Sequence, residues 1–241
     1  QAEIKKRHGF YLEINGVMSS PLFAELLIHQ IDSDIKGAYV KTESEIPMSM
    51  GLKSSSAAAN AILTACADAL GIELSSDEIL NKNADASIKA GVSITGAFDD
   101  SAACLLGGLV FTDNFGRRII DRRPMPDGLR AVIILPGYTI SKSDFPISRL
   151  KDMKDEAEEI FHNAYCGNIF KAMYDNGSCT CRALGISNDI ADFCIAHGAK
   201  TAGVSGTGPA VGVLTDSDKV DALVKNFEDE RYIITDIWNG I

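Results

Sequence analysis

Two different spacings of hydrophobic residues predict alternating strands and helices in the first half of the chain. Short β-prone runs lie near Gly9–Ile14 and Gly37–Glu43, and the segment Pro21–Ile31 between them has the apolar spacing of an amphipathic helix. A second helical stripe follows and is expected to stop at Gly71, because glycine readily takes the left-handed conformation that closes a helix. The apolar residues of this stripe are Ala59, Ile62, Leu63, Cys66 and Leu70.

Capping and turn residues mark the next elements. Ser75-Ser-Asp-Glu78 has the capping-box pattern that opens a helix, and this helix is expected to end at Gly91. A strand is predicted at Gly107–Thr112 and a turn at Asp113–Gly116. Four arginines flank Ile119-Ile120, where we expect them to decorate a hairpin or loop.

Proline and glycine cluster at Arg122–Gly128, which predicts a boundary between a domain of residues 1–125 and a domain of residues 126–241. In the second domain the order is strand, helices, two strands, helix, strand, which is typical of a split βαβ, or ferredoxin-like, sandwich. The fold class is therefore expected to be α+β. The predicted strands are Ala131–Leu135, Ala202–Val204, Ala210–Leu214 and Tyr232–Thr235, and the predicted helices are Lys151–Tyr174, Ile190–His197 and Ser217–Phe227.

Composition limits the possible partners. The 241 residues are 46% hydrophobic and carry a net charge of −10, which argues against nucleic acid as a partner because phosphate backbones require clustered Lys and Arg. No apolar stretch approaches the length of a membrane span. The six cysteines lack zinc-like spacing and mostly lie in apolar runs, which suits free thiols in a reducing cytoplasm.

The stretch Ile46–Asn60 carries the clearest chemical signal. It runs from a strand-like segment through a loop that contains Gly51 and Lys53, and then through three serines into the Ala-rich helix. The first amides of a helix lack internal partners and favour anions, and small residues let a phosphate approach them. We interpret this stretch as a cradle for nucleotide phosphates. A serine N-cap at Ser55 or Ser56 is the simpler alternative, but it leaves the glycine and the lysine unexplained.

Two further segments are candidates for function. Asp99 and Asp100 precede a mostly apolar run, where a carboxylate near a γ-phosphate could accept a hydroxyl proton or help to hold magnesium. The alternative is an Asp N-cap on a short helix at Ala102–Leu106, and for Asp99 it competes seriously. In Gly203-Val-Ser-Gly-Thr-Gly-Pro209, the glycines suit either an anion-binding loop or a tight hairpin.

These three segments together resemble the motifs of the GHMP small-molecule kinases. The match in Pro47–Ser56 is to P-x-x-x-G-L-x-S-S-[AS], and a Gly-Gly pair seven residues after Asp100 selects that carboxylate as the catalytic one, with Asp99 as the alternative. The resemblance implies a two-domain fold, with a ribosomal-S5-like α/β domain followed by a ferredoxin-like domain. It also implies that ATP is bound by Pro47, Met48, Ser49, Met50, Gly51, Leu52, Lys53, Ser54, Ser55 and Ser56.

The remaining implied roles follow from the same resemblance. Lys53 is expected to assist Asp100 or to offset phosphate charge, and Ser55 to help bind Mg²⁺. An acidic magnesium ligand is also expected on the preceding helix. Asp85 is the nearest candidate although its spacing is one residue off, and an exposed helical carboxylate is the simpler alternative.

In detail, the chain is similar to the archaeal shikimate kinases within that superfamily. Gly-Leu-Lys-Ser-Ser-Ser, Gly96-Ala-Phe-Asp with a second Asp, and Ala172-Met-Tyr-Asp-Asn-Gly177 all fit. The family also has an N-terminal glycine-containing strand and loop that helps to form the substrate pocket. This segment is not found before Gln1, so we expect residues 1–125 to lack their first strand and loop.

The resemblance implies an ATP-dependent kinase, cytoplasmic and monomeric or homodimeric, that phosphorylates the 3-hydroxyl of shikimate. Gly206, Thr207 and Gly208 are then expected to contact this substrate. Arg149 is a candidate partner for its carboxylate, although a solvated arginine is an equal alternative. Two rival hypotheses stay open: another GHMP kinase, acting on homoserine or mevalonate, and a non-catalytic ligand-binding relative.

Overall fold

The computed structural model of the chain describes residues 2–93, 95–140, 149 and 152–240. It separates into two compact units. The first comprises Gln1–Ile46, Lys53–Met125 and Trp238–Ile241, and the second comprises Pro47–Leu52 and Pro126–Ile237. Two short segments thus belong to a different unit from their neighbours in sequence, and one of them is the loop that leads into the Ala-rich helix.

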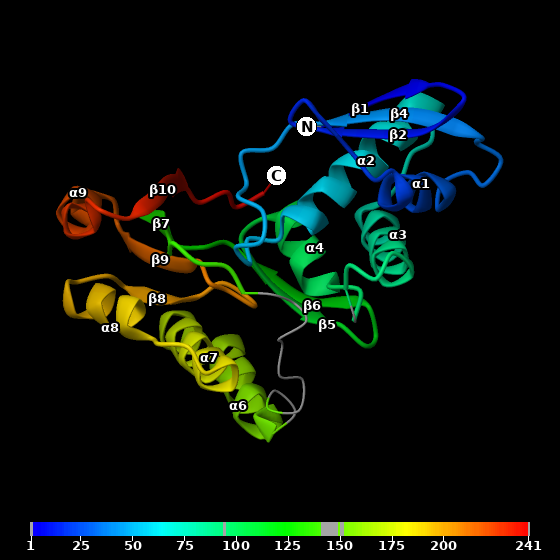
Figure 1. Cartoon of the computed structure of the whole chain (residues 1–241). Helices are drawn as coiled ribbons and strands as arrows, with labels where there is room; N and C mark the ends of the chain where they lie inside the picture. Colours follow the sequence, from blue (N-terminus) through cyan, green and yellow to red (C-terminus); the bar gives the residue numbers. More distant parts are fainter. Residues whose placement is uncertain (1, 94, 141–148, 150–151, 241) are drawn as a thin grey trace. The chain divides into compact units, whose positions relative to one another are not determined.

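The first unit contains a four-stranded sheet in the order β1-β4-β2-β3 (Figure 1). Its central strands β2 and β4 are parallel, and the other two pairs are antiparallel. The predicted strands near Gly9–Ile14 and Gly37–Glu43 are confirmed as β2 and β4, whereas β1 and β3 were not expected. The bounds are β1 (Ala2–Lys6), β2 (Gly9–Ile14), β3 (Val17–Ser19) and β4 (Gly37–Thr42).

Among its described residues this unit also has four helices, of which α1, α2 and α3 share one hydrophobic core with the sheet. Leu12 and Val40 supply the sheet side of that core, and Leu27 and Leu63 supply part of the helix side. The predicted capping box is confirmed, because the Ser75 and Glu78 side chains each bond the other residue's backbone amide. The bounds are α1 (Leu22–His29), α2 (Ser54–Leu70), α3 (Ser76–Lys89) and α4 (Phe98–Leu106).

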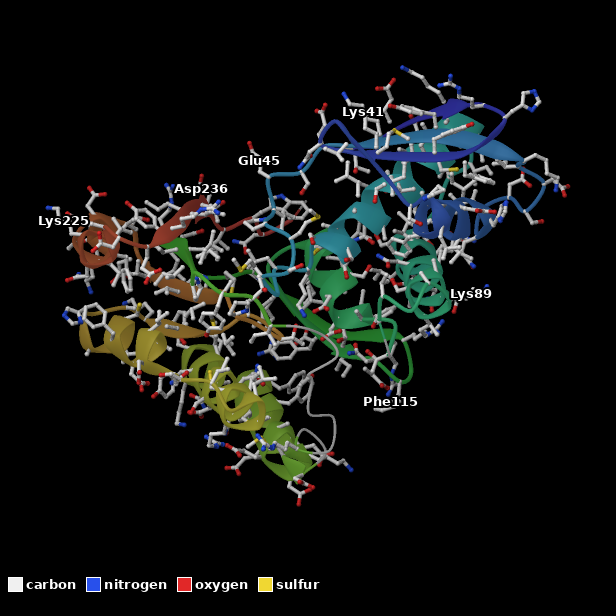
Figure 2. All side chains as sticks on the ribbon, viewed as in Figure 1. Lys41, Glu45, Lys89, Phe115, Lys225 and Asp236 are labelled. Carbon is white, nitrogen blue, oxygen red and sulfur yellow. The ribbon has the colours of Figure 1, made fainter. Side chains whose placement is uncertain are left out.

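A two-stranded hairpin, β5 (Leu109–Asp113) and β6 (Arg118–Arg123), follows α4. The predicted turn and the predicted hairpin arginines are both confirmed. Phe115 lies fully exposed in this turn (Figure 2). Residues near the C-terminus join the same unit, since the Gly108 amide donates to the Trp238 carbonyl at 2.8 Å.

The second unit contains an antiparallel sheet in the order β10-β7-β9-β8. This is the strand order of a ferredoxin-like sandwich, which confirms the predicted arrangement. Val132, Val213 and Ala202 from three of its strands pack against α8 and α9. The strand bounds are β7 (Leu129–Leu135), β8 (Thr201–Val204), β9 (Val211–Asp216) and β10 (Arg231–Asp236).

The helices of the second unit differ from the predicted ones at one place. A single helix over Lys151–Tyr174 is wrong, because the chain breaks at Gly167, whose φ of 103° no helix can accommodate. The predicted helix at Ser217–Phe227 is confirmed but subdivided into 3₁₀ and α turns. The observed bounds are α6 (Lys154–Tyr165), α7 (Ile169–Leu184), α8 (Asp189–Ala196), η2 (Ser217–Lys219), α9 (Val220–Val224) and η3 (Lys225–Phe227).

Helix α7 approaches β8 through a pair of glycines. A Cβ added to Gly177 would lie 2.6 Å from the Cα of Gly203, and one added to Gly203 would lie 2.8 Å from the Met173 carbonyl oxygen. The glycine that ends the Ala172–Gly177 motif is therefore required by close packing between helix and sheet. Within the described part of the chain, no helix combines the length and apolar character needed to cross a bilayer.

Candidate functional site

Helix α2 begins with a strained residue and an open N-terminus. Its N-cap is Lys53, which adopts a left-handed φ of 60°, and no side chain among the described residues caps the helix. Ser55 and Ser56 lie inside the first turn, so the proposal that either is a simple N-cap is wrong. Because the first amides of a helix have no internal acceptor, this end of α2 can receive an anion.

Helix α4, which carries the two aspartates, starts in a similar way. It begins at Phe98, and its N-cap Ala97 also has a left-handed φ, of 50°. Asp99 and Asp100 both lie in the first turn, so the alternative of an Asp N-cap on a helix at Ala102–Leu106 is wrong. Non-glycine residues rarely adopt this conformation, and such strain concentrates at functional sites.

The two aspartates differ in their surroundings. Asp99 is exposed, and its backbone amide donates to Asn114 Oδ1 at 3.0 Å. Asp100 is partly buried, and its Oδ2 lies 3.0 Å from Lys53 Nζ. The ion pair between Lys53 and Asp100 joins the start of α2 to the start of α4, so the open helix end and the carboxylate lie together within the first unit.

Burial, followed by the charge of Asp99, raises the pKa of Asp100, while the Lys53 ammonium opposes this rise. A carboxylate with a raised pKa is a stronger base than one in water, yet Lys53 favours its charged form. Of the two aspartates, Asp100 therefore has the environment of a proton acceptor.

Beneath these first turns lies a buried polar cluster, formed by Asn60 of α2, Asn83 of α3 and Ser101 of α4. Asn83 Nδ2 donates to Asn60 Oδ1 at 2.8 Å and to Ser101 Oγ at 2.9 Å. It also lies 3.1 Å from the Ser56 carbonyl oxygen. This cluster was not predicted from the sequence, although polar residues on the buried faces of three helices are a visible signal.

The first part of the cradle lies in the second unit, where it packs against the glycine-rich loop. Ser205 Oγ donates to the Gly51 carbonyl at 3.0 Å, and the Ala210 amide donates to the Met50 carbonyl at 3.2 Å. Gly51 has a φ of 77°, and a Cβ there would lie 2.2 Å from the Ser205 carbonyl oxygen. Two motifs far apart in the sequence are thereby joined.

The glycine-rich loop connects the antiparallel neighbours β8 and β9, so the hairpin alternative describes its backbone. Gly206 and Gly208 both have positive φ, and Thr207 between them is exposed. The hairpin also has a structural role, because its Ser205 side chain bonds the Gly51 carbonyl. Its proposed role in substrate binding stays a prediction.

Comparisons with known proteins show the family to which the chain belongs. Residues 19–108 match the family model described as the GHMP kinases N-terminal domain. The shikimate kinase of Methanothrix thermoacetophila is 38% identical over 201 residues, which cover 83% of this chain and 69% of that protein. The shikimate kinase of Methanosarcina mazei is 35% identical over 220 residues, covering 90% and 74%. The chain belongs to the archaeal shikimate kinase family.

Solved structures show that this family member has the GHMP kinase fold. The mevalonate kinase of Methanococcus jannaschii superposes with a TM-score of 0.76 at 20% identity, covering 99% of this chain and 88% of that one. The homoserine kinase of Cytophaga hutchinsonii gives a TM-score of 0.70 at 18% identity, covering 99% and 85%. The predicted two-domain α+β fold is therefore confirmed.

Two other predicted site residues, Asp85 and Arg149, take no part in the ion pair between Lys53 and Asp100. Asp85 on α3 forms an ion pair with Arg117 at 2.6 Å. Arg149 is exposed, and the residues on either side of it lie outside the described residues. In the described part of the chain, no group of three or more His, Cys, Asp and Glu side chains could hold a metal ion.

Proposed function

We propose that this chain transfers the γ-phosphoryl group of ATP to the 3-hydroxyl of shikimate, giving shikimate 3-phosphate. The GHMP kinase family to which it belongs uses ATP, and relatives that match most of the chain are shikimate kinases. The acceptor is a carboxylated polyol, so the site must bind one anionic substrate beside another.

The observation that carries this proposal is the ion pair between Lys53 and Asp100 at the uncapped start of α2. Phosphates would bind to the free amides of Ser54–Ser56, as anions do at helix N-termini. The other proposed ATP contacts come from Pro47–Leu52, the part of the cradle that Ser205 holds.

In the proposed reaction Asp100 accepts the proton of the substrate hydroxyl as that oxygen attacks the γ-phosphorus. The new O–P bond forms while the bond between the γ-phosphorus and the bridging oxygen of ADP breaks. Lys53 keeps Asp100 charged before the reaction and offsets phosphate charge during it. Positioning and charge neutralisation dominate phosphoryl transfer, so few other protein groups are needed. Asp99 is the alternative base, but its exposure makes it the weaker candidate.

Magnesium is proposed as the metal cofactor, since Mg²⁺ is commonly held by one or two protein oxygens together with substrate phosphates. Ser55 fits this role, because its side chain is exposed in the first turn of α2. When bound, the ion would neutralise phosphate charge. Asp85 stays a weaker prediction, since it would first have to leave Arg117. If Asp85 is a ligand, an Asp85→Asn variant requires more Mg²⁺ for half-maximal rate.

Gly206, Thr207, Gly208 and Arg149 are proposed to bind shikimate. The glycine-rich loop exposes Gly206 and the Thr207 hydroxyl, while the Gly208 amide donates to the Ser205 carbonyl at 2.9 Å and so shapes the loop. Arg149 offers a guanidinium for the carboxylate. The cytoplasmic location and the monomeric or homodimeric state stay predictions of the same kind.

A coupled ADP-release assay with shikimate, homoserine and mevalonate tests the function, with NMR of the product to locate the new phosphate ester. Shikimate alone should support turnover, with phosphate at the 3-position. Turnover of homoserine or mevalonate in its place would assign a different GHMP kinase activity. Binding of ATP with no turnover of any acceptor would indicate a non-catalytic relative.

A further inference from the structure

The buried cluster of Asn60, Asn83 and Ser101 is a closed hydrogen-bond ring between three helices. Besides the bonds from Asn83, Ser101 Oγ donates to Asn60 Oδ1 at 2.8 Å, and Asn60 Nδ2 donates to the Ser101 carbonyl at 2.9 Å. Ser87 Oγ donates to Asn83 Oδ1 at 3.0 Å. Asn83 and Ser101 are fully buried, and every side-chain polar atom of the ring has a partner.

An apolar core would be the simpler way to join these helices. Burying amides and hydroxyls costs free energy unless every group is paired, whereas well-packed apolar side chains carry no such condition. What the hydrogen bonds add is direction, because each fixes a distance and an angle between two particular atoms. Ala59, Ala84 and Ala102 on the same three helices are fully buried, and such small side chains fix the spacing of helices only loosely.

Side chains of the ring also bond the backbone in the first turns of α2 and α4. Asn83 lies 3.1 Å from the carbonyl oxygen of Ser56, which is next to Ser55 in the first turn of α2. Asn60 bonds the carbonyl of Ser101, which is next to Asp100 in the first turn of α4. One set of buried side chains therefore ties the proposed phosphate-binding turn to the turn that carries the proposed base.

We propose that Asn83, through Asn60 and Ser101, is a positioning residue that fixes Asp100 relative to the first turn of α2. This inference rests on the proposed function, since it assigns the ring to the same phosphoryl transfer. None of the three side chains is proposed to touch a substrate. The ring sets where the hydroxyl oxygen is held with respect to the phosphate, and small errors in such positions reduce rates strongly.

This role predicts a kinetic pattern that a purely structural role does not. Breaking the ring leaves the amides of α2 and the Lys53 ammonium in place, so ATP still binds. It allows the α4 turn to shift with respect to α2, so the reacting atoms are misaligned after binding. The loss should therefore fall on kcat rather than on KM.

The test uses two ring variants and one control in the full chain. Asn83→Leu replaces the centre of the ring with an apolar side chain, and Ser101→Ala is the milder change should the first fail to fold. Ile79→Val is the control, because Ile79 lies one turn before Asn83 on α3 in the hydrophobic core. Both ring variants should lower kcat about tenfold or more and change either KM less than about threefold. The control should lower Tm without lowering kcat.

Hydrogen exchange followed by mass spectrometry gives a readout that does not require turnover. In the ring variants, the hydrogen-bonded amides that follow these first turns, from residue 57 in α2 and from residue 101 in α4, should exchange faster than in the control, while those of β7 to β10 should not. A kcat within about twofold of wild type in both variants would overturn the inference, as would equal exchange in ring and control proteins. If wild type itself does not phosphorylate shikimate, the proposed function fails, and the exchange result alone decides whether the ring holds the two turns.

Discussion

At the scale of single residues, the environment of Asp100 decides which of two adjacent carboxylates is the better base. Asp99 is exposed, whereas burial raises the pKa of Asp100 and Lys53 opposes that rise. The two residues are adjacent in the sequence, and only the family resemblance favoured Asp100 over Asp99 as the base. The structure adds a physical difference between them, which can be measured.

Replacing Asp100 with Asn should abolish most activity without lowering stability. Loss of a general base typically costs about 10²–10⁴ in rate. Because the folded state raises the pKa of Asp100, it binds this proton more tightly than the unfolded state does, so the charged carboxylate weakens folding above its pKa. We expect kcat to fall by that factor while Tm at pH 7 is equal or higher. Undiminished turnover, or equal loss in Asp99→Asn, would remove Asp100 from this role.

Lys53 should control the pH at which activity is lost on acidification. The base must be deprotonated, so kcat falls as the pH drops through the Asp100 pKa, which lies above its ordinary value. Since Lys53 lowers that pKa, Lys53→Met should raise it further and move the acidic limb of the log kcat profile to higher pH. Lys89→Met is the control, because Lys89 is exposed in the last turn of α3. An unmoved limb in Lys53→Met would contradict the assignment.

At the scale of elements, the starts of α2 and α4 show what local sequence rules could not find. Both helices have non-glycine N-caps, Lys53 and Ala97, with positive φ. Capping rules favour Ser, Thr, Asp and Asn at that position, and so they misplaced the caps at Ser55, Ser56 and the aspartates. Helix α2 itself was correctly predicted, because its apolar stripe and its stop at Gly71 are local features.

The loop at Gly51 gives a prediction at this scale. Gly51→Ala adds both a strained backbone and a Cβ placed 2.2 Å from the Ser205 carbonyl oxygen. Gly71→Ala is the matched control, because Gly71 also has positive φ but nothing within 4 Å of the added Cβ. The control should lose about 1–2 kcal/mol of unfolding free energy from strain alone. Gly51→Ala should lose a further ~1–3 kcal/mol from overpacking and also raise the KM for ATP. Equal losses by denaturant unfolding would show that the loop does not depend on this contact.

At the scale of the whole molecule, the six cysteines are free and differ widely in access. Cys166 is exposed, while burial raises the pKa of Cys104 to about 11 and that of Cys194 to about 12. The remaining three thiols are buried, and their pKa values are raised as well. Because the thiolate is the reactive form, most of these groups should be inert in the folded chain.

Reaction with Ellman's reagent at pH 8 should therefore show about one fast thiol in the native protein and all six after unfolding in guanidinium. A Cys166→Ser variant should lose the fast phase and keep its activity, since Cys166 lies outside the proposed site. Several fast thiols in the native protein would mean that the core opens more readily than its burial implies.

The sequence by itself determined the elements whose signals are local. The capping box at Ser75 and the glycine stop at Gly71 depend on residues close together in the chain, as do the individual strands and helices of the second domain. The phosphate site is a prediction of the same local kind, since it rests on a glycine, a lysine and serines at the start of a helix. The type of reaction came from the resemblance to the GHMP kinases.

Only the tertiary structure decided which distant residues act together. It added β1 and β3 to the sheet, placed the Gly51 loop against Ser205, and joined Asn60 to Ser101 across 41 positions of sequence. Such contacts leave no periodic trace in the sequence, since each depends on how whole helices and loops pack. Chain position alone could therefore name Asp100 as a candidate, but only packing shows what surrounds it and what holds it in place.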